Sequence, residues 1–186
     1  IRDRQIEAAV SWSKRHSVNI VIVGGKDAWK TTDILAKNRI PVIYEGVTSI
    51  PMRRFEDYDQ PYKTPYVLYE SGVQFCISSF GYAGSTEQLR NLPYQASMAA
   101  SYGLPKDVAL RAITLSVAEI IGVDKQIGSL DPGKDATLFI SDGDPLEIRT
   151  NIIQAYIQGR EIDMKDRHKS LYSKFREKYR QLDILK

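Results

Sequence analysis

Short apolar runs alternate with longer amphipathic stretches along the first part of the chain. The runs are rich in β-branched residues, and they span residues 18–23, 40–44 and 73–78. Nearly continuous apolarity is typical of strands buried on both faces, as in parallel sheets. Stretches that favour helices lie before and between them, at residues 2–16, 27–38 and 64–71. This order predicts two βαβ units and therefore a parallel sheet. Asp27 is the expected N-cap of the second helix.

The pattern changes after the third run. Residues 93–121 favour helix in two pieces, interrupted at residues 103–105, and a capping-box spacing predicts a short helix opening at Ser116. Turn residues then separate short apolar segments, which predicts an antiparallel element with strands at 136–140, 152–157 and about 161–162. The tail, residues 163–183, has apolar side chains on one face and predicts an amphipathic helix.

Composition narrows the class of protein. Apolar residues make up 42% and charged residues 26%, which is typical of a globular protein, and no apolar run is long enough to span a membrane. The chain begins with Ile1 rather than Met, so we expect it to be trimmed or cut from something longer. The single cysteine, Cys76, excludes an internal disulfide. We expect a soluble protein, of the cytoplasm or the periplasm.

The net charge of +3 combines two regions of opposite sign. Residues 165–180 hold seven basic side chains against Asp166 and Glu177, so this tail carries +5 and the remainder −2. Because the basicity is local, a general nucleic-acid-binding function loses support. We expect the tail helix to pack against its own fold. The alternatives are a dimer contact and an anionic partner, either nucleic acid or a lipid surface.

A specific signature occupies residues 103–146. Its four segments are Gly103-Leu-Pro-Lys-Asp-Val-Ala-Leu, Ala118-Glu-Ile-Ile-Gly, Ile127-Gly-Ser-Leu-Asp-Pro-Gly-Lys-Asp-Ala and Asp142-Gly-Asp-Pro-Leu. In order and spacing this closely resembles the C-terminal signature of the amidohydrolase superfamily, especially imidazolonepropionase-like proteins. The preceding βα stretch resembles the family more loosely, so that the likeness covers roughly residues 1–162.

The resemblance implies a fold class and a place within a longer protein. Family members have a distorted (β/α)8 barrel and a small β-sandwich built from both chain ends, and a whole barrel needs about 250 residues. The expected class is α/β: a partial TIM-like barrel comprising the last three strands and helices, the C-terminal part of the sandwich, and a terminal helix. The expected domains are residues 1–122 for the barrel, 123–162 for the sandwich and 163–186 for the basic amphipathic tail helix.

The resemblance also implies metal-assisted hydrolysis. The family's usual reaction activates water on one or two metal ions at the carboxyl ends of the barrel strands, and an aspartate after the last strand takes the proton. A histidine is expected where Val23-Gly24-Gly25 stands, and Ser79 occupies the position of the aspartate. Because a hydroxyl is a poor base and a weak ligand, we expect a degraded metal site. A mis-set register, a single-metal variant, or replacement by Asp27 or Glu45 stays open.

The same match places a substrate rim at Gly24, Gly25, Arg53, Ser78 and Tyr82. Arg53 belongs to the loop after the second strand, which in a barrel lies on the active-site face; an ordinary solvated loop is the alternative. No metal ligand or cofactor is assigned within this chain. A divalent metal such as zinc is left to the full-length protein.

Other candidate residues have structural explanations. His16 is expected as a cation at a helix C-terminus rather than a ligand. Cys76 is expected as a small core residue, because a thiol without a nearby base is not activated. Asp142 and Asp144 are expected to form a turn rather than a metal site.

Two functions stay open. In the first, the full-length protein hydrolyses a non-peptide C–N bond of a small, for instance cyclic, amide, although this chain alone is not expected to be active. In the second, a non-catalytic relative uses the fold as a binding or assembly module. Expected partners are a small-molecule substrate, the missing N-terminal part of the same protein and a second copy. Neither nucleic acid nor a membrane span is expected.

Overall fold

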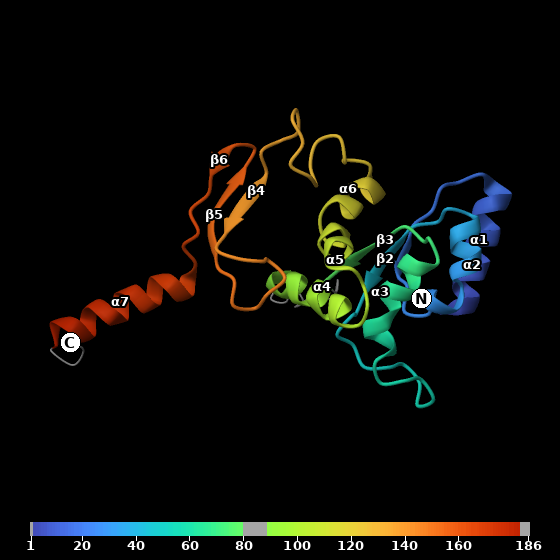
Figure 1. Ribbon diagram of the computed structural model, residues 1–186, viewed down its shortest axis with the longest axis horizontal. Helices are drawn as coiled ribbons and strands as arrows, with labels where there is room; N and C mark the ends of the chain where they lie inside the picture. The colour runs from blue at the N-terminus through green and yellow to red at the C-terminus, as the bar shows by residue number, and fades with distance from the viewer. Residues whose placement is uncertain (1, 80–88, 183–186) are drawn as a thin grey trace.

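Two small sheets, one parallel and one antiparallel, organise the chain in the computed structural model, which describes residues 2–79 and 89–182 (Figure 1). The first sheet has the order β1-β2-β3, and both of its strand pairs are parallel. Its strands are β1 (Ile22–Gly24), β2 (Val42–Glu45) and β3 (Phe75–Ser78). The predicted parallel sheet is therefore confirmed, with each strand shorter than its apolar run.

Helices cover one face of this sheet and enclose the main core. Alternate strand residues point into the core, among them Ile22, Val42, Tyr44 and Ile77. They meet buried side chains of α1 (Asp3–His16), α2 (Thr32–Lys37), α3 (Gln60–Glu70) and α4 (Leu92–Ser101). Burial of these side chains is the main force that holds the helices to the sheet.

The other face of the sheet is covered unevenly. Val23, Ile43 and Cys76 lie side by side in register across the three strands. Val23 is 48% exposed and Ile43 is half-buried, whereas Cys76 is 1% exposed. The face is therefore open at β1 and closed at β3. The expectation that Cys76 is a core residue is confirmed, and burial raises the pKa of its thiol to about 11.

The predicted helix at residues 27–38 is two elements. A 3-10 turn, η1 (Ala28–Lys30), precedes α2. Asp27 stands at the N-cap of η1 but makes no capping hydrogen bond, so the predicted cap is wrong. The reason is that its carboxylate is bonded elsewhere, to Arg53 and to the backbone N–H of Asp3.

In the described part of the chain three helices lie between the two sheets, and the third is the predicted short helix. The predicted interruption at 103–105 separates α4 from α5 (Lys106–Ala112), and a second one precedes α6 (Leu115–Ile121). The predicted capping box at Ser116 is wrong, because α6 begins at Leu115 with Thr114 at its N-cap. The Thr114 hydroxyl donates back to the Leu110 carbonyl at 2.8 Å and so completes the end of α5.

The predicted antiparallel element is confirmed. Its strands, in the order β4-β5-β6, are β4 (Leu138–Ser141), β5 (Ile152–Ile157) and β6 (Arg160–Glu161). Asp142 accepts hydrogen bonds from Asn151, and Asp144 accepts one from the Leu146 N–H, so both act in a turn as expected. Leu146 is buried in the main core and connects this turn to the parallel half.

The tail forms α7 (Arg167–Gln181), as predicted, and Asp166 caps it by accepting from the Lys169 N–H at 2.7 Å. None of its described side chains is buried, and it extends away from both sheets (Figure 1). Among the described residues nothing buries its apolar side, so the expected packing of this helix against its own fold is not found in this part of the protein. No helix among the described residues is long and apolar enough to cross a membrane.

Candidate functional site

The carboxyl edge of the parallel sheet collects most of the candidate residues. Because parallel strands end at the same edge, the turn Gly24-Gly25, the side chain of Glu45 and the pair Ser78-Ser79 all lie there. Glu45 is the register partner of Ser78 on the neighbouring strand. Tyr82, the remaining rim candidate, lies outside the described residues.

The turn after β1 has no room for a functional side chain at its second position. Gly25 is buried, and its backbone has a φ of +51°, in the left-handed region that favours glycine. A Cβ there would lie 2.7 Å from Cγ1 of Val42. Gly25 can therefore contribute only backbone to this edge, and a histidine at this position would not fit.

Ser79 is held as a polar core residue. It is 7% exposed, and its Oγ accepts a hydrogen bond of 3.2 Å from Nε2 of Gln95 on α4. A serine nucleophile needs an adjacent general base, and a carboxamide is not one. The geometry therefore does not activate Ser79. No pattern in the sequence indicates Gln95, which lies 16 residues further on in a helix typical of an ordinary core.

Gln95 itself is incompletely satisfied. It is 8% exposed, and its Oε1 is the one buried side-chain nitrogen or oxygen atom among the described residues without a hydrogen-bond partner. An unpaired buried polar atom costs about 1–3 kcal/mol. If the amide were rotated, its oxygen would accept from Ser79 and its nitrogen would be left over, so either orientation leaves one end unpaired.

A cavity of about 530 Å³ lies beside this pair. Gly46, Thr48 and Ser49 after β2 line one side. Asn91, Tyr94 and Gln95, at the start of α4, line the other, and Ile148 comes from the loop before β5. Pockets for small molecules have volumes of about 300–1,000 Å³ and mix apolar walls with a few polar groups. We take this cavity as the candidate ligand pocket.

Arg53 forms an internal ion-pair cluster. Its two terminal nitrogens bind the Asp27 carboxylate in bidentate fashion, at 2.8 and 2.6 Å, and one of them also binds Glu56. Asp27 is 1% exposed, and Lys30 lies 3.8 Å from it and 3.6 Å from Glu56. We call Asp27, Lys30, Arg53 and Glu56 the loop clamp, because they fasten the loop after β2 to the turn after β1. Arg53, a predicted residue of the substrate rim, therefore binds two carboxylates of the protein itself.

The clamp shifts the acid–base behaviour of its members. The hydrogen bond from Arg53 is the largest effect on Asp27 and, against burial, holds the pKa of Asp27 below its ordinary value of 3.8. Burial alone would raise the pKa of Glu56. Hydrogen bonds from the Arg53 side chain and from the backbone of Arg53 and Met52 outweigh that effect and lower the Glu56 pKa. Both carboxylates therefore stay ionised at neutral pH.

These contacts bear on the expected metal site. Asp27 is paired with Arg53 and is not available as a ligand, which leaves Glu45 as the candidate carboxylate at this edge. A catalytic zinc site usually needs three protein ligands. No three His, Cys, Asp or Glu side chains converge in this way among the residues that the structure describes. Those residues do not fit a metal site by themselves.

His16 is the last residue of α1, and its ring centroid lies 4.9 Å from that of Trp12.

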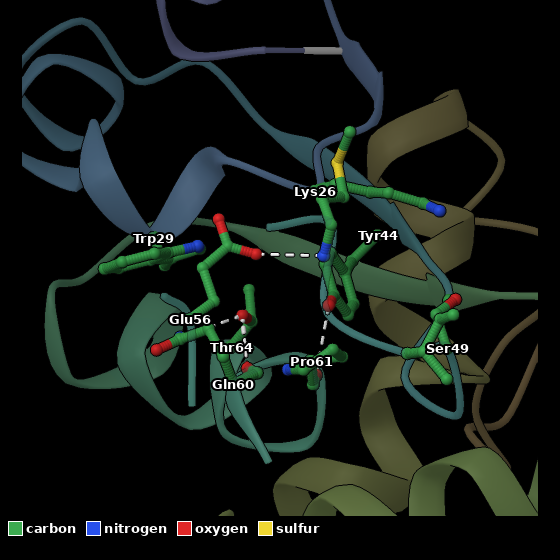
Figure 2. A pocket seen from close by; sticks show the side chains of 11 residues that line it. Lys26, Trp29, Tyr44, Ser49, Glu56, Gln60, Pro61 and Thr64 are labelled. Carbon is green, nitrogen blue, oxygen red and sulfur yellow. Dashed lines mark hydrogen bonds between the residues drawn. The ribbon is translucent and has the colours of Figure 1, made fainter. Parts of the chain in front are cut away.

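A second, water-sized cavity of about 20 Å³ lies under the loop after β2 (Figure 2). The Tyr44 side chain forms part of the cavity wall, and the Tyr44 hydroxyl donates to the Pro61 carbonyl at 3.0 Å (Figure 2). Burial raises the pKa of Tyr44 to about 12, so that the hydroxyl stays a donor. This cavity is too small for a substrate, and its contacts stabilise the loop.

Solved structures show what this architecture is similar to. An amidohydrolase from Thermotoga maritima MSB8 is 27% identical and superimposes with a TM-score of 0.75 over 88% of this chain and 42% of its own. A prolidase solved with N-methylphosphonate-L-proline is 16% identical, with a TM-score of 0.61 over 85% of this chain and 43% of its own. That second likeness concerns the fold alone.

Sequence comparisons also find similarity to amidohydrolases. The amidohydrolase tasK of Hapsidospora irregularis is 32% identical over 65 residues, which is 35% of this chain and 7% of that protein. The chain thus spans less than half the length of these relatives. The family model for the amidohydrolase family matches residues 68–165, which include Ser79, Gln95 and the whole C-terminal signature. The chain therefore belongs to the amidohydrolase family.

Proposed function

We propose that this chain is the C-terminal part of a barrel hydrolase. It would supply the last three strands of a (β/α)8 barrel and part of a small β-sandwich. The parallel order of β1-β2-β3 and the open face at Val23 support this, because a closed barrel buries that face on its interior. The coverage of only 42% of the Thermotoga structure supports it as well.

We propose further that the whole protein hydrolyses a non-peptide C–N bond in a small, for instance cyclic, amide. The observation that carries this is the cavity at the carboxyl edge of the sheet, because four of its lining residues, Asn91, Tyr94, Gln95 and Ile148, lie in the segment matched to the amidohydrolase family. A metal such as zinc, if the protein uses one, would depend on ligands upstream of Ile1 and would supply an activated water. In this chain, the loop clamp and the Ser79–Gln95 pair would shape the pocket.

A non-catalytic binding module is the second candidate. Two observations favour it: Gln95 donates a hydrogen bond to Ser79, the residue matched by sequence to the family's aspartate, and Arg53 pairs with Asp27. In these contacts Ser79 and Asp27 are not free to move a proton or to hold a metal. In this alternative the cavity binds a ligand without chemistry.

The deciding experiment uses the full-length protein. Its metal content is measured by plasma mass spectrometry, and hydrolysis is screened over cyclic amides, N-acyl amino acids and dipeptides with and without a chelator. Bound metal with chelator-sensitive turnover supports the hydrolase. Absence of both metal and turnover would contradict the hydrolase and support the non-catalytic binding module.

The role of Ser79 is tested in the same assay. If Ser79 only supports the pocket, Ser79→Ala should change kcat by less than about tenfold, whereas losing a general acid or base costs about 10²–10⁴. Ser101→Ala is the control, since Ser101 is an exposed serine of α4 whose hydroxyl donates to the Ser97 carbonyl. A loss of a hundredfold or more at Ser79 alone would give it a catalytic role.

A further inference from the structure

The exposed helix α7 has a definite arrangement of side chains around its axis. Successive residues of an α-helix are rotated by about 100°. Leu171, Phe175 and the C-cap residue Leu182 therefore lie within a narrow stripe, and Tyr172 and Tyr179 extend it on one side. All five are at least 40% exposed. His168 lies at the N-terminal end of the same stripe. The rings of Phe175 and Tyr179 lie 6.5 Å apart, which fits their place on one face.

Cations border this apolar stripe on both sides. The six basic residues of α7 fall into two rows, one of Arg167, Lys174 and Lys178 and the other of Lys169, Arg176 and Arg180. The face opposite the stripe carries Ser170, Ser173, Glu177 and Gln181, so the one acidic residue of the helix lies away from the stripe. An amphipathic helix that lies in a membrane interface has this composition: a bulky apolar face and many Lys and Arg on the polar face.

We propose that α7 binds the surface of an anionic lipid bilayer. Leu171, Phe175 and Leu182 would enter the boundary between head groups and acyl chains. The bordering lysines and arginines can extend past their own apolar stems to reach lipid phosphates. The tyrosines, with an apolar ring and a polar hydroxyl, suit the same depth.

Charge separates this partner from a second copy of the chain. Pairing two α7 helices along their apolar stripes would bring four rows of cations together, with no acidic residue on that face to offset them. Nucleic acid would use the two cationic rows but not the apolar stripe between them. A surface with both negative charge and an apolar interior uses every exposed group on this side of the helix.

The test is flotation of the full-length protein with lipid vesicles. We expect binding to vesicles of roughly seven parts phosphatidylcholine to three parts phosphatidylglycerol, and little binding to phosphatidylcholine alone. Each cation near such a surface contributes about fivefold to binding, so Lys174→Gln with Lys178→Gln should weaken it about 25-fold. Phe175→Ser should weaken it about tenfold or more. Ser170→Ala with Ser173→Ala, on the opposite face, is the matched control and should change nothing.

Several results would overturn the proposal. One is equal flotation with and without residues 167–186. Another is binding that the double glutamine variant abolishes but Phe175→Ser leaves intact, because that shows adsorption without insertion. A third is that neither the unmodified protein nor any variant floats with the vesicles, while light scattering shows a dimer that dissociates in Phe175→Ser. That result would assign the apolar stripe to a second copy of the chain.

Discussion

Arg53 is the residue on which the loop after β2 depends. Its guanidinium pairs with a carboxylate, Asp27, that is almost wholly buried. Arg53→Gln should therefore remove the bidentate partner and leave Asp27 with the weaker contacts to Lys30 and to the Asp3 N–H. We expect the free energy of unfolding to fall by about 2–3 kcal/mol, since breaking a buried pair costs more than breaking an exposed one. The measurement is urea denaturation. Arg54→Gln is the control: this neighbouring arginine is exposed, and its substitution should change the free energy by less than about 0.5 kcal/mol.

The same cluster should make stability depend on pH. Asp27 and Glu56 have pKa values below their ordinary values of 3.8 and 4.5. A group whose pKa is lowered by folding stabilises the protein above its unfolded pKa and loses that effect as the pH falls. Unfolding free energy should therefore drop between about pH 5 and pH 3, and less steeply in Arg53→Gln. Equal slopes in the two proteins would show that the pair is not responsible.

These residues can be identified from the sequence, but their pairing cannot. Arg53 is expected in the loop after the second strand, on the active-site face, and Asp27 is expected as a helix N-cap or as a replacement ligand. The two are 26 positions apart, and their contact depends on the path of the loop, which no periodicity records. Gln95 was missed for the same reason, because its bond to Ser79 joins a helix to a strand end.

Helix α3 contains a carbonyl that its own backbone cannot satisfy. Pro65 lies inside the helix and has no N–H to donate to the Pro61 carbonyl four residues earlier. The Tyr44 hydroxyl donates to that carbonyl instead. Tyr44→Phe should therefore lower the unfolding free energy by about 1–3 kcal/mol. In a Pro65→Ala background, where residue 65 can donate, the same substitution should cost about 1 kcal/mol less. A double-mutant cycle with no coupling would refute this account.

Gly128, which follows α6 within the C-terminal signature, has a packing role. Gly128 has a φ of +98°, and a Cβ there would lie 2.8 Å from the Cβ of Ala118 and 3.0 Å from the Cα of Leu115. Gly133 has a similar φ, +91°, but nothing lies within 4 Å of its position. Both alanine variants strain the backbone by about 1–2 kcal/mol. Only Gly128→Ala should add a steric cost, about 1–3 kcal/mol. Thermal unfolding of the two variants measures the difference directly.

Elements marked by strong local signals could be predicted, and the others could not. The strands followed from their continuous apolar runs, and the break before α5 followed from Gly103 and Pro105. The break between η1 and α2 has no glycine or proline to mark it. Its cause is partly tertiary: Asp27 is drawn to Arg53, and the Thr31 hydroxyl donates back to the Ala28 carbonyl at 3.3 Å.

The molecule as a whole exposes apolar surface on both sheets. Val21 and Val23 are exposed at the β1 side of the parallel sheet, and Phe139, Ile153 and Ile157 are exposed on the antiparallel one. Large apolar patches and unpaired strand edges promote association. We expect the 186-residue chain, made alone, to bind the dye ANS and to self-associate at micromolar concentration. Sedimentation velocity with dye titration is the measurement, and a monomeric chain that does not bind the dye would contradict it.

Val23 allows a sharper test of how the chain is completed. Val23→Thr keeps the shape of the side chain and replaces one methyl group by a hydroxyl. In the isolated chain Val23 is 48% exposed, so the free energy of unfolding should change by less than about 0.5 kcal/mol. If upstream strands close a barrel over this face, the hydroxyl is buried in the full-length protein and should cost about 1–3 kcal/mol. Val18→Thr, at a position that is exposed before β1, is the control and should be mild in both proteins. Equal effects of Val23→Thr in the two proteins would mean that the missing part leaves this face uncovered, and the barrel assignment would then be wrong.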